Sequence, residues 1–320
     1  MSTVRVAALL LPLCAIACLD NATPPPVTPW SDDAGPVDAG SVEVGGVDAG
    51  SPIRVTTFNV HRFFDTVCQS GACAPGDYEG VPTEAQFDAQ ADAIAGALRT
   101  LRPDVAMIQE VETQACLDAL TSRLADLLPN GVLGEIGTPA SVDVAVLTSG
   151  TITQVIHHRP VLVRPDGSLT VFSRELLEVH LTLRGAKVIA FAAHFRSKVN
   201  DDPGRRLAEA QAAHDLVDAA AQANPDALVV LGGDLNDVPG SPPLQALEAD
   251  GALLRVAREL PTPAQATNFY DGEGEAIDHI FFATEGAGAY LPGTAQVVGG
   301  SAGYAGSDHD PLRAAFSLPR

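Results

Sequence analysis

Short apolar runs alternate with alanine-rich stretches from Ile53 to the C-terminus, and this alternation predicts the secondary structure. Runs of roughly five to eight residues rich in Val, Ile, Leu and Phe are typical of buried strands. The predicted strands are 53–60, 105–109, 142–148, 176–183, 188–193, 227–231, 279–282 and 312–316. The predicted helices are 83–101, 114–128, 203–221 and 244–249.

Local signals at two places indicate how these elements connect. Thr83 and Glu84 open the first helix as a cap and an acidic first turn, and apolar residues follow at helical spacing. The strands 176–183 and 188–193 flank Arg184-Gly185, which favours an antiparallel hairpin. Hairpins mixed with strand–helix units predict two sheets stacked face to face with helices outside, as one α/β sandwich domain over residues 53–320.

The first residues of the chain lack this alternation. Arg5 precedes an apolar run from Val6 to Leu19, which is typical of a secretory signal and is shorter than the roughly 20 residues that span a bilayer. The end of the run, Ala15-Ile16-Ala17-Cys18, is similar to a bacterial lipobox, although Leu is usual where Ala15 stands. We expect a signal peptide over residues 1–18, of the lipoprotein type with a lipidated Cys18. Ordinary cleavage and a buried apolar start are the alternatives.

Residues 19–52 are rich in Pro, Asp, Ala and Gly, and the sequence Val-Asp-Ala-Gly occurs at both 37–40 and 47–50. Such a segment buries too little apolar surface to offset the entropy of ordering it. We predict a disordered tether between an anchor and the domain. The expected location is therefore outside the cytoplasm, either as an envelope lipoprotein attached to the membrane through Cys18 or as an extracellular protein.

Composition restricts the partners and the compartment. The 40 acidic and 19 basic residues give a net charge of -21, so nonspecific attachment to nucleic acid or to an anionic membrane is not expected. A hydrophobic content of 46% over 320 residues supports a substantial core. Cys68 and Cys73 flank a Gly-containing stretch and predict a short disulfide in an oxidising compartment. Cys116 is expected to be a buried free thiol on a helix.

Polar side chains recur where the apolar strands end, and catalytic groups are commonly held at such positions on a rigid scaffold. These residues are Asn59, Glu110, His194, Asp234, Asn236, Asp278 and the segment Ser307-Asp308-His309-Asp310-Pro311. Each of them alone could equally be a turn-forming or structural residue. Their repeated occurrence in order along one domain favours a shared site. The oxygen ligands that they offer suit Mg²⁺ or Mn²⁺, with Ca²⁺ as a further possibility, and do not suit a structural zinc site.

Taken together, these motifs resemble the endonuclease/exonuclease/phosphatase superfamily, which contains DNase I. The matching stretches are Thr57-Phe58-Asn59-Val60, Ile108-Gln109-Glu110-Val111, Ala193-His194-Phe195, Gly232-Gly233-Asp234-Leu235-Asn236, Ile277-Asp278-His279-Ile280 and Ser307-Asp308-His309-Asp310-Pro311. The resemblance covers the whole domain. It implies a DNase I-like four-layer α/β/β/α sandwich and a metal-dependent phosphoric ester hydrolase.

The resemblance also assigns catalytic roles. It pairs Asp278 with His309, which together with Asp234 activates the attacking water, and either Asp234 or His309 takes the proton. A His held by a carboxylate keeps one tautomer and tolerates becoming cationic, as such a base requires. Asn236 and His194 are expected to hold the scissile phosphate. His194 is expected to protonate the leaving group, unless it is a structural histidine of the sheet.

The metal ligands that the resemblance implies are Glu110, Asn59 and Asp308. A cation bound there would offset charge on the phosphate as the phosphorus becomes five-coordinate. The superfamily also has an acidic partner for its first histidine on the preceding strand, where this sequence offers Asp143 in place of a longer Glu.

Basic residues near the predicted site are candidates for phosphate binding. Arg174 lies in Phe172-Ser173-Arg174-Glu175, which resembles the segment that supplies a phosphate-binding arginine in nuclease members, although an edge-strand solvent residue is the alternative. Arg196 and Lys198 follow His194 in a stretch similar to one in secreted bacterial nucleases. With Arg205 and Arg206 they predict a local positive patch suited to a nucleic-acid backbone, or else a solvated loop.

The leading hypothesis is an exported phosphodiesterase, a nuclease that hydrolyses DNA or RNA, acting as a monomer on nucleic acid or another phosphodiester. A phosphatase or a sphingomyelinase-like phospholipid phosphodiesterase is the alternative within enzymes, because one fold can carry many substrates. A surface-tethered binding module without catalysis is the alternative from another class. The complete set of acidic and histidine residues argues against it.

Overall fold

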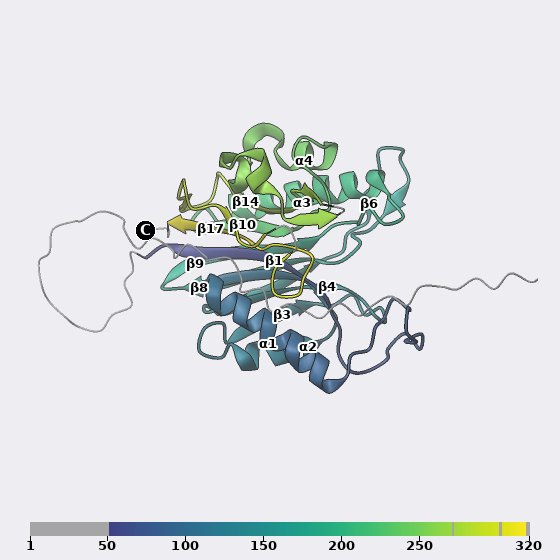
Figure 1. Cartoon of the computed structure of the whole chain (residues 1–320). Helices are drawn as coiled ribbons and strands as arrows, with labels where there is room; N and C mark the ends of the chain where they lie inside the picture. The colour runs from purple at the N-terminus through teal and green to yellow at the C-terminus, as the bar shows by residue number, and fades with distance from the viewer. Residues whose placement is uncertain (1–50, 271, 301–302, 318–320) are drawn as a thin grey trace, which may run out of the picture.

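Two β-sheets lie face to face, and helices cover the outer face of each (Figure 1), which confirms the predicted α/β/β/α sandwich. In this computed structural model, residues 51–270, 272–300 and 303–317 are described. The predicted signal peptide at 1–18 and all of the predicted tether except residues 51 and 52 lie outside the described residues. Within the described part of the chain, no helix combines the length and the apolar character needed to span a bilayer.

The first sheet is built around two central parallel strands, β1 and β2, with antiparallel strands on both sides. Its strands, in sheet order, are β15 (Ala289–Tyr290), β17 (Leu312–Ser317), β1 (Ile53–Phe63), β2 (Val105–Val111), β4 (Asp143–Thr148) and β3 (Asn130–Gly134), and β16 (Gln296–Val297) also pairs with β17.

The second sheet has the same design, with β9 and β10 as its parallel pair. Its strands, in sheet order, are β11 (Leu253–Arg255), β14 (Asp278–Ala283), β10 (Ala227–Asp234), β9 (Ala186–His194), β8 (Leu176–Leu183) and β5 (Thr151–His158). Two small hairpins pair β6 (Leu162–Val163) with β7 (Leu169–Thr170) and β12 (Asn268–Tyr270) with β13 (Glu273–Glu275).

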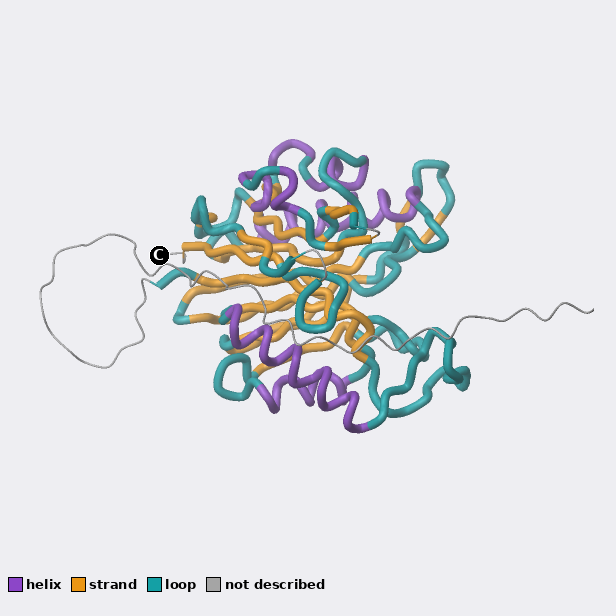
Figure 2. The backbone as a smooth tube through the Cα atoms, viewed as in Figure 1, coloured by secondary structure: helices purple, strands orange, loops and turns teal. Residues whose placement is uncertain are grey.

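The helices form the outer layers of the sandwich (Figure 2). They are α1 (Glu84–Leu101), α2 (Gln114–Arg123), α3 (Pro203–Ala223) and α4 (Pro242–Leu247), with 3₁₀ turns η1 (Ala249–Gly251), η2 (Val256–Glu259) and η3 (Thr262–Gln265). Thr83 caps α1 in a capping box with Gln86, as its sequence predicts. The prediction of a helix over 114–128 was wrong at its end. Leu124 and Leu128 are buried in a following turn, so their apolar spacing continues after the helix stops at Arg123.

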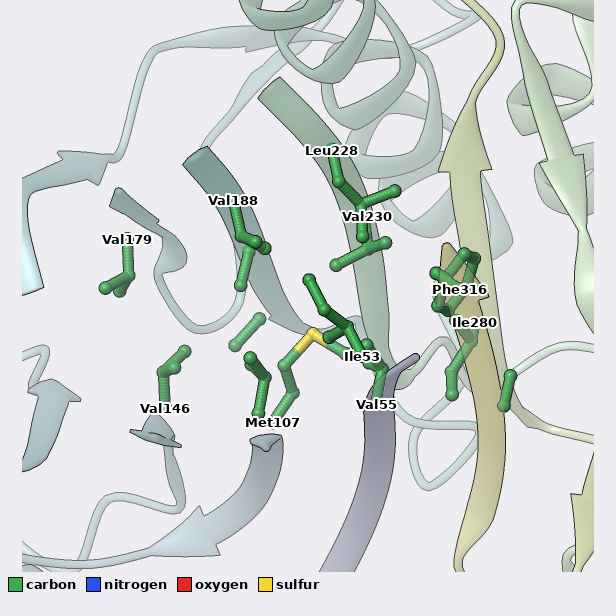
Figure 3. Close-up of a cluster of buried hydrophobic side chains, with 14 of the residues drawn as sticks. Ile53, Val55, Met107, Val146, Val179, Val188, Leu228, Val230, Ile280 and Phe316 are labelled. Carbon is green, nitrogen blue, oxygen red and sulfur yellow. The ribbon is translucent and has the colours of Figure 1, made fainter. Parts of the chain in front are cut away.

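Three apolar layers hold the sandwich together. The central layer lies between the two sheets, where Val55 and Met107 of the first sheet meet Val188 and Val230 of the second (Figure 3). Because side chains alternate across a strand, the opposite faces of the same strands pack against the helices. One outer layer joins the first sheet to α1 and α2, and the other joins the second sheet to α3 and α4. Burial on both faces explains why these strands read as nearly continuous apolar runs.

The parallel pairs place the polar strand ends together. Within the second sheet, Asp234 is in register with His194 on β9 and with Asp278 on β14. Within the first sheet, Asn59 is in register with Gln109, and the pairing then shifts around Glu110. Glu110 has a φ of 69°, so a bulge re-aims its side chain at the end of β2.

Two consecutive glycines on β10 allow close approach just before Asp234. A Cβ at Gly232 would lie 2.3 Å from Cε of Met107 in the facing sheet. A Cβ at Gly233 would lie 1.9 Å from the backbone carbonyl oxygen of Ala193 on β9. The first clash meets a flexible side chain, whereas the second meets backbone and cannot be relieved without moving a strand.

Gly233→Ala is therefore expected to lower the free energy of unfolding by about 2 kcal/mol, as overpacking of a core does. Gly96→Ala is the control, because Gly96 lies on α1 with open space around it and should gain about 0.5 kcal/mol from better helix propensity. Urea denaturation followed by circular dichroism measures both variants. Equal stability of Gly233→Ala and the wild type would contradict this account of the strand contact.

Candidate active site

Asn59 joins the two sheets at the centre of the site. Its side-chain amide nitrogen donates to Oε1 of Glu110 at 3.2 Å and to Oδ2 of Asp234 at 3.1 Å, and the residue is 1% exposed. Its amide oxygen accepts the backbone N–H of His61 at 3.0 Å. Through its nitrogen Asn59 orients the two carboxylates. Its role as a metal ligand stays a prediction, for which its oxygen keeps one lone pair beside the His61 hydrogen bond.

The predicted pair of Asp278 and His309 is present and buried. Oδ2 of Asp278 lies 2.7 Å from Nδ1 of His309, and the backbone N–H of Asp278 donates to Oγ1 of Thr267 at 3.0 Å. Ser307 positions the histidine, because its hydroxyl accepts the His309 N–H at 3.0 Å and donates to the Asn59 carbonyl at 2.7 Å. The C-terminal motif is thereby joined directly to the end of β1.

The charge around His309 fixes its protonation state. Burial by itself would lower the pKa of His309, but the charge and hydrogen bond of Asp278, with further contributions from Asp234 and Asp308, raise it to about 10. His309 is therefore a cation at neutral pH, locked by Asp278 in one orientation.

Asp234 lies between the two site histidines. Its Oδ2 atom is 3.5 Å from Nε2 of His194 and 3.9 Å from Nε2 of His309. One polar atom each from Asp234, Asp278 and His309 lies within 4.8 Å of the others. Burial, followed by the negative charge of Asp278, raises the pKa of Asp234 to about 7. A carboxyl group poised near neutral pH beside an imidazolium is suited to proton transfer.

His194 and Asn236 complete the second-sheet side of the site. Burial and the positive charges of Arg174 and His309 hold the pKa of His194 well below its usual range, so this imidazole is neutral. Asn236 has a φ of 54°, and its N–H donates to Oδ1 of Asp234 at 2.9 Å. Its amide nitrogen donates to the Phe195 carbonyl at 3.2 Å. The turn after β10 thus holds Asn236 next to Asp234.

Asp143 is not bonded to His194 within the described residues. Its Oδ2 atom accepts from the Ser141 hydroxyl at 2.7 Å and from the Ile136 N–H at 3.4 Å. Burial raises the pKa of Asp143 to about 6. The shorter Asp, bonded to its own strand and the preceding turn, does not supply the acidic partner that the resemblance implied.

Glu110 has the character of a metal ligand. Oε2 accepts the Arg62 backbone N–H at 2.8 Å, and among the described residues its carboxylate forms no ion pair with a Lys or Arg side chain. Asp308 is half-exposed, with Oδ1 2.7 Å from Nδ1 of His61. Glu110, an acidic oxygen donor without a compensating lysine or arginine, fits a hard divalent cation. Asp308 would join it as a ligand by giving up its pair with His61, whose pKa the Asp308 hydrogen bond raises.

Sequence reasoning missed His61 and Arg62. Both have positive φ values, 54° and 48°, inside β1 where its pairing with β2 shifts register between Asn59 and Phe63. Strained backbone conformations of this kind collect at functional sites. No periodicity indicates them, and the only available signal was their position next to Asn59.

The basic residues after His194 are largely compensated. Lys198 pairs with Glu275 at 2.8 Å, and the buried Arg206 pairs with Asp201 at 2.7 Å and Asp237 at 2.8 Å. Arg196 donates to the backbone carbonyls of Val199 and Asn200, and Arg205 to that of Val171. The free positive charge on this loop is smaller than the sequence count suggests. Arg174, in contrast, is half-buried near His194 and donates to the Phe195 carbonyl at 3.3 Å.

Comparison with known families agrees with this geometry. The model of the Endonuclease/Exonuclease/phosphatase family matches residues 56–309, and the chain belongs to this family. It is a phosphoric ester hydrolase by membership, and the enzymes of this family typically use a divalent metal ion. No curated protein sequence matches the chain.

Solved structures show the same fold at low sequence identity. Truncated TDP2 from Caenorhabditis elegans has a TM-score of 0.56 at 17% identity, covering 83% of this chain and 98% of that chain. The human Nocturnin catalytic domain has a TM-score of 0.58 at 16% identity, covering 83% and 93%. Sphingomyelinase C from Streptomyces griseocarneus has a TM-score of 0.55 at 20% identity, covering 83% and 99%. These similarities establish the fold and leave the substrate open.

Replacing Asp278 by Asn is expected to lower the pKa of His309 from about 10, because it removes the charge and the anionic acceptor that raise it. In the wild type, the stabilisation from this raised pKa is complete below about pH 6.5 and is lost as the pH rises through about 10. In Asp278→Asn that loss moves to lower pH. NMR titration of the imidazole measures the pKa, with Asp226→Asn at an exposed Lys187 pair as control. An unchanged pKa in Asp278→Asn would contradict the assignment.

Proposed function

We propose that this protein is an exported, metal-dependent phosphodiesterase and that its substrate is nucleic acid. The observation that carries the proposal is the junction at Asn59, which holds Glu110 of one sheet and Asp234 of the other within 3.2 Å of one amide group, with His309 beside them. Asn59 thus holds Glu110, the predicted cation ligand, and Asp234, the predicted proton-transfer group, at a fixed separation.

The chain's own groups divide the chemistry of hydrolysis. A divalent cation at Glu110 and Asp308 would offset negative charge on the phosphate. His309 is cationic and stabilises charge that develops on the phosphoryl oxygens. Asp234, with its pKa near 7, is the group able to take a proton from the attacking water.

The neutral His194, Asn236 and Arg174 would bind the phosphate oxygens as hydrogen-bond donors. Since His194 is neutral in this arrangement, it can donate a hydrogen bond to the leaving oxygen but does not carry the second proton that a general acid would transfer, unlike the role that the resemblance implied. Arg196 and Lys198 would bind phosphates of the nucleic acid further from the cut site. To do so, Arg196 would exchange its bonds to backbone carbonyls, and Lys198 its pair with Glu275, for phosphate contacts. TDP2 from D. rerio, a structural relative with a TM-score of 0.58 at 17% identity, has been solved with a single strand DNA product, which supports nucleic acid as the substrate class.

A phospholipid phosphodiesterase is the second candidate, and one surface feature favours it. The β6–β7 hairpin exposes Val161, Val163 and Leu169 at 66%, 60% and 68%. Val199, on the loop after His194, is 75% exposed, and Arg164 of the hairpin pairs with Asp202 of that loop at 2.8 Å. No such apolar hairpin was expected from the sequence. Exposed aliphatic side chains next to the site are suited to contact with a lipid surface.

The export proposal rests on the N-terminal sequence and on the disulfide. Cys68 and Cys73 are bonded, with Cα atoms 6.0 Å apart, as the sequence predicts. Disulfides persist mainly outside the cytoplasm. The free Cys116 is buried on α2, also as expected.

Expression of the full chain in a bacterial host is expected to yield a membrane-fraction protein that begins at a lipidated Cys18, identified by mass spectrometry of the mature N-terminus. Cys18→Ser should abolish lipidation and leave the domain folded. A cytoplasmic chain retaining residues 1–18 would contradict export, and a soluble exported chain would contradict lipidation alone.

The purified domain is expected to cleave plasmid DNA or RNA with Mg²⁺ or Mn²⁺ and to lose activity in EDTA. Glu110→Gln should lower the rate by about a hundredfold or more, because it removes a charged ligand. Glu84→Gln is the matched control, since Glu84 is exposed at the start of α1.

Phosphocholine release from sphingomyelin vesicles is measured in parallel with DNA and RNA cleavage. Release of phosphocholine without nucleic-acid cleavage would favour the second candidate. Absence of cleavage with Mg²⁺, Mn²⁺ and Ca²⁺ on every substrate would reject the enzymatic proposal.

A further inference from the structure

A stapled loop follows the catalytic end of β1. Residues 64–82 contain the Cys68–Cys73 disulfide, and Glu79 accepts the backbone N–H groups of Gln69 at 2.5 Å and Ser70 at 2.7 Å. Glu79 is 1% exposed, so this carboxylate fixes the loop from inside. The loop, dark blue in Figure 1, lies at the same end of the molecule as β6.

This loop presents one aromatic side chain beside the metal carboxylate. Tyr78 is 50% exposed, and its ring packs edge-on against buried Phe64 with the centroids 6.0 Å apart. The guanidinium carbon of Arg62 lies 4.7 Å from the Tyr78 ring centroid. The backbone N–H of the same Arg62 donates to Glu110. Arg62 therefore links Tyr78 to Glu110, the predicted cation ligand, since it contacts both.

Electrostatics place the Tyr78 hydroxyl in the same neighbourhood. Burial and then the negative charge of Glu110 raise the pKa of Tyr78, while the positive charge of Arg174 opposes the rise. The charges of Glu110 and Arg174 thus both act on the Tyr78 hydroxyl. One edge of the contact is anchored by buried Phe64, and half of the Tyr78 side chain stays exposed to solvent.

We propose that Tyr78 and Arg62 form a subsite that stacks an unpaired nucleobase of single-stranded nucleic acid next to the scissile phosphate. The proposal rests on the nuclease function and specifies the substrate class. Every nucleobase has a planar face that stacks on an aromatic ring or a guanidinium, so such a subsite is tolerant of sequence. Bases within a duplex are already stacked on each other, which favours single strands.

The same geometry disfavours a choline head group. A quaternary ammonium ion binds to an aromatic face through attraction between the cation and the ring. Arg62 already lies over one face of the Tyr78 ring, and its positive charge would repel a second cation near that ring. A nucleobase is neutral, so this charge does not prevent it from stacking on the exposed part of the subsite. The Tyr78 subsite therefore favours nucleic acid over a choline phospholipid. The predicted metal ligands and the histidines do not distinguish the two, because both substrates contain a phosphodiester.

Cleavage of a single-stranded oligonucleotide is compared with cleavage of a strand of equal length in which the bases flanking the cut site are replaced by abasic residues. We expect the wild type to prefer the base-bearing strand about tenfold in kcat/KM, as one stacked base can provide. Tyr78→Ala should reduce this preference toward one, and Tyr78→Phe should retain it. Val67→Ala is the matched control, because Val67 is 59% exposed on the same loop and should leave the preference unchanged.

The outcomes separate this inference from the proposed function. A wild type that cleaves both strands equally, or a Tyr78→Ala variant that keeps the full preference, would overturn the subsite while the nuclease function stands. An equal loss on both strands in Tyr78→Ala and Tyr78→Phe would assign Tyr78 a structural role and also overturn it. A wild type that cleaves neither strand but releases phosphocholine would reject both proposals.

Discussion

The site depends on one buried amide. Asn59 is the point at which the two sheets exchange polar contacts, because its nitrogen meets Glu110 of the first sheet and Asp234 of the second. Its side-chain oxygen accepts the His61 N–H, and its backbone carbonyl accepts the hydroxyl of Ser307, which holds His309 in place. A buried amide of this kind must satisfy its donors and acceptors, so the spacing of the two sheets and the spacing of the catalytic groups are set together.

Charge in this small volume is balanced only in part. Burial and the charge of Asp278 raise the pKa of Asp234, and the charges of Asp278, Asp234 and Asp308 raise the pKa of His309 against the effect of burial. The protein tolerates this cost because rigid strands on either side hold the groups. The excess of acidic oxygen on the Glu110 side is the feature that calls for a divalent cation, and the proton-binding pair on the other side supplies acid–base chemistry.

Substrate choice is expected to come from the loops around this shared centre, since family members with the same fold include enzymes with different substrates. Two surface features lie at the rim, the stapled loop that presents Tyr78 and the β6–β7 hairpin with its exposed aliphatic residues. Neither contacts Asp234 or His309 in the described structure. Differences in substrate can therefore evolve in these loops without disturbing the junction at Asn59.

The sequence by itself determined the four inner strands of each sheet, the main helices and the disulfide, because burial on both faces and turn chemistry are local properties of the chain. It did not predict edge strands such as β3 and β5. It also predicted Glu110, Asp234, Asp278 and His309 as site residues, since polar residues at the ends of apolar strands stand out in a single sequence, and the structure holds Asp234, Asp278 and His309 close together. Only the tertiary structure decided how polar atoms are paired. The amide of Asn59 turned its nitrogen toward the carboxylates, and the basic residues after His194 were bound by acids distant in sequence, such as Glu275. Such pairings depend on distances and directions between separate elements, which the order of residues along a chain does not contain.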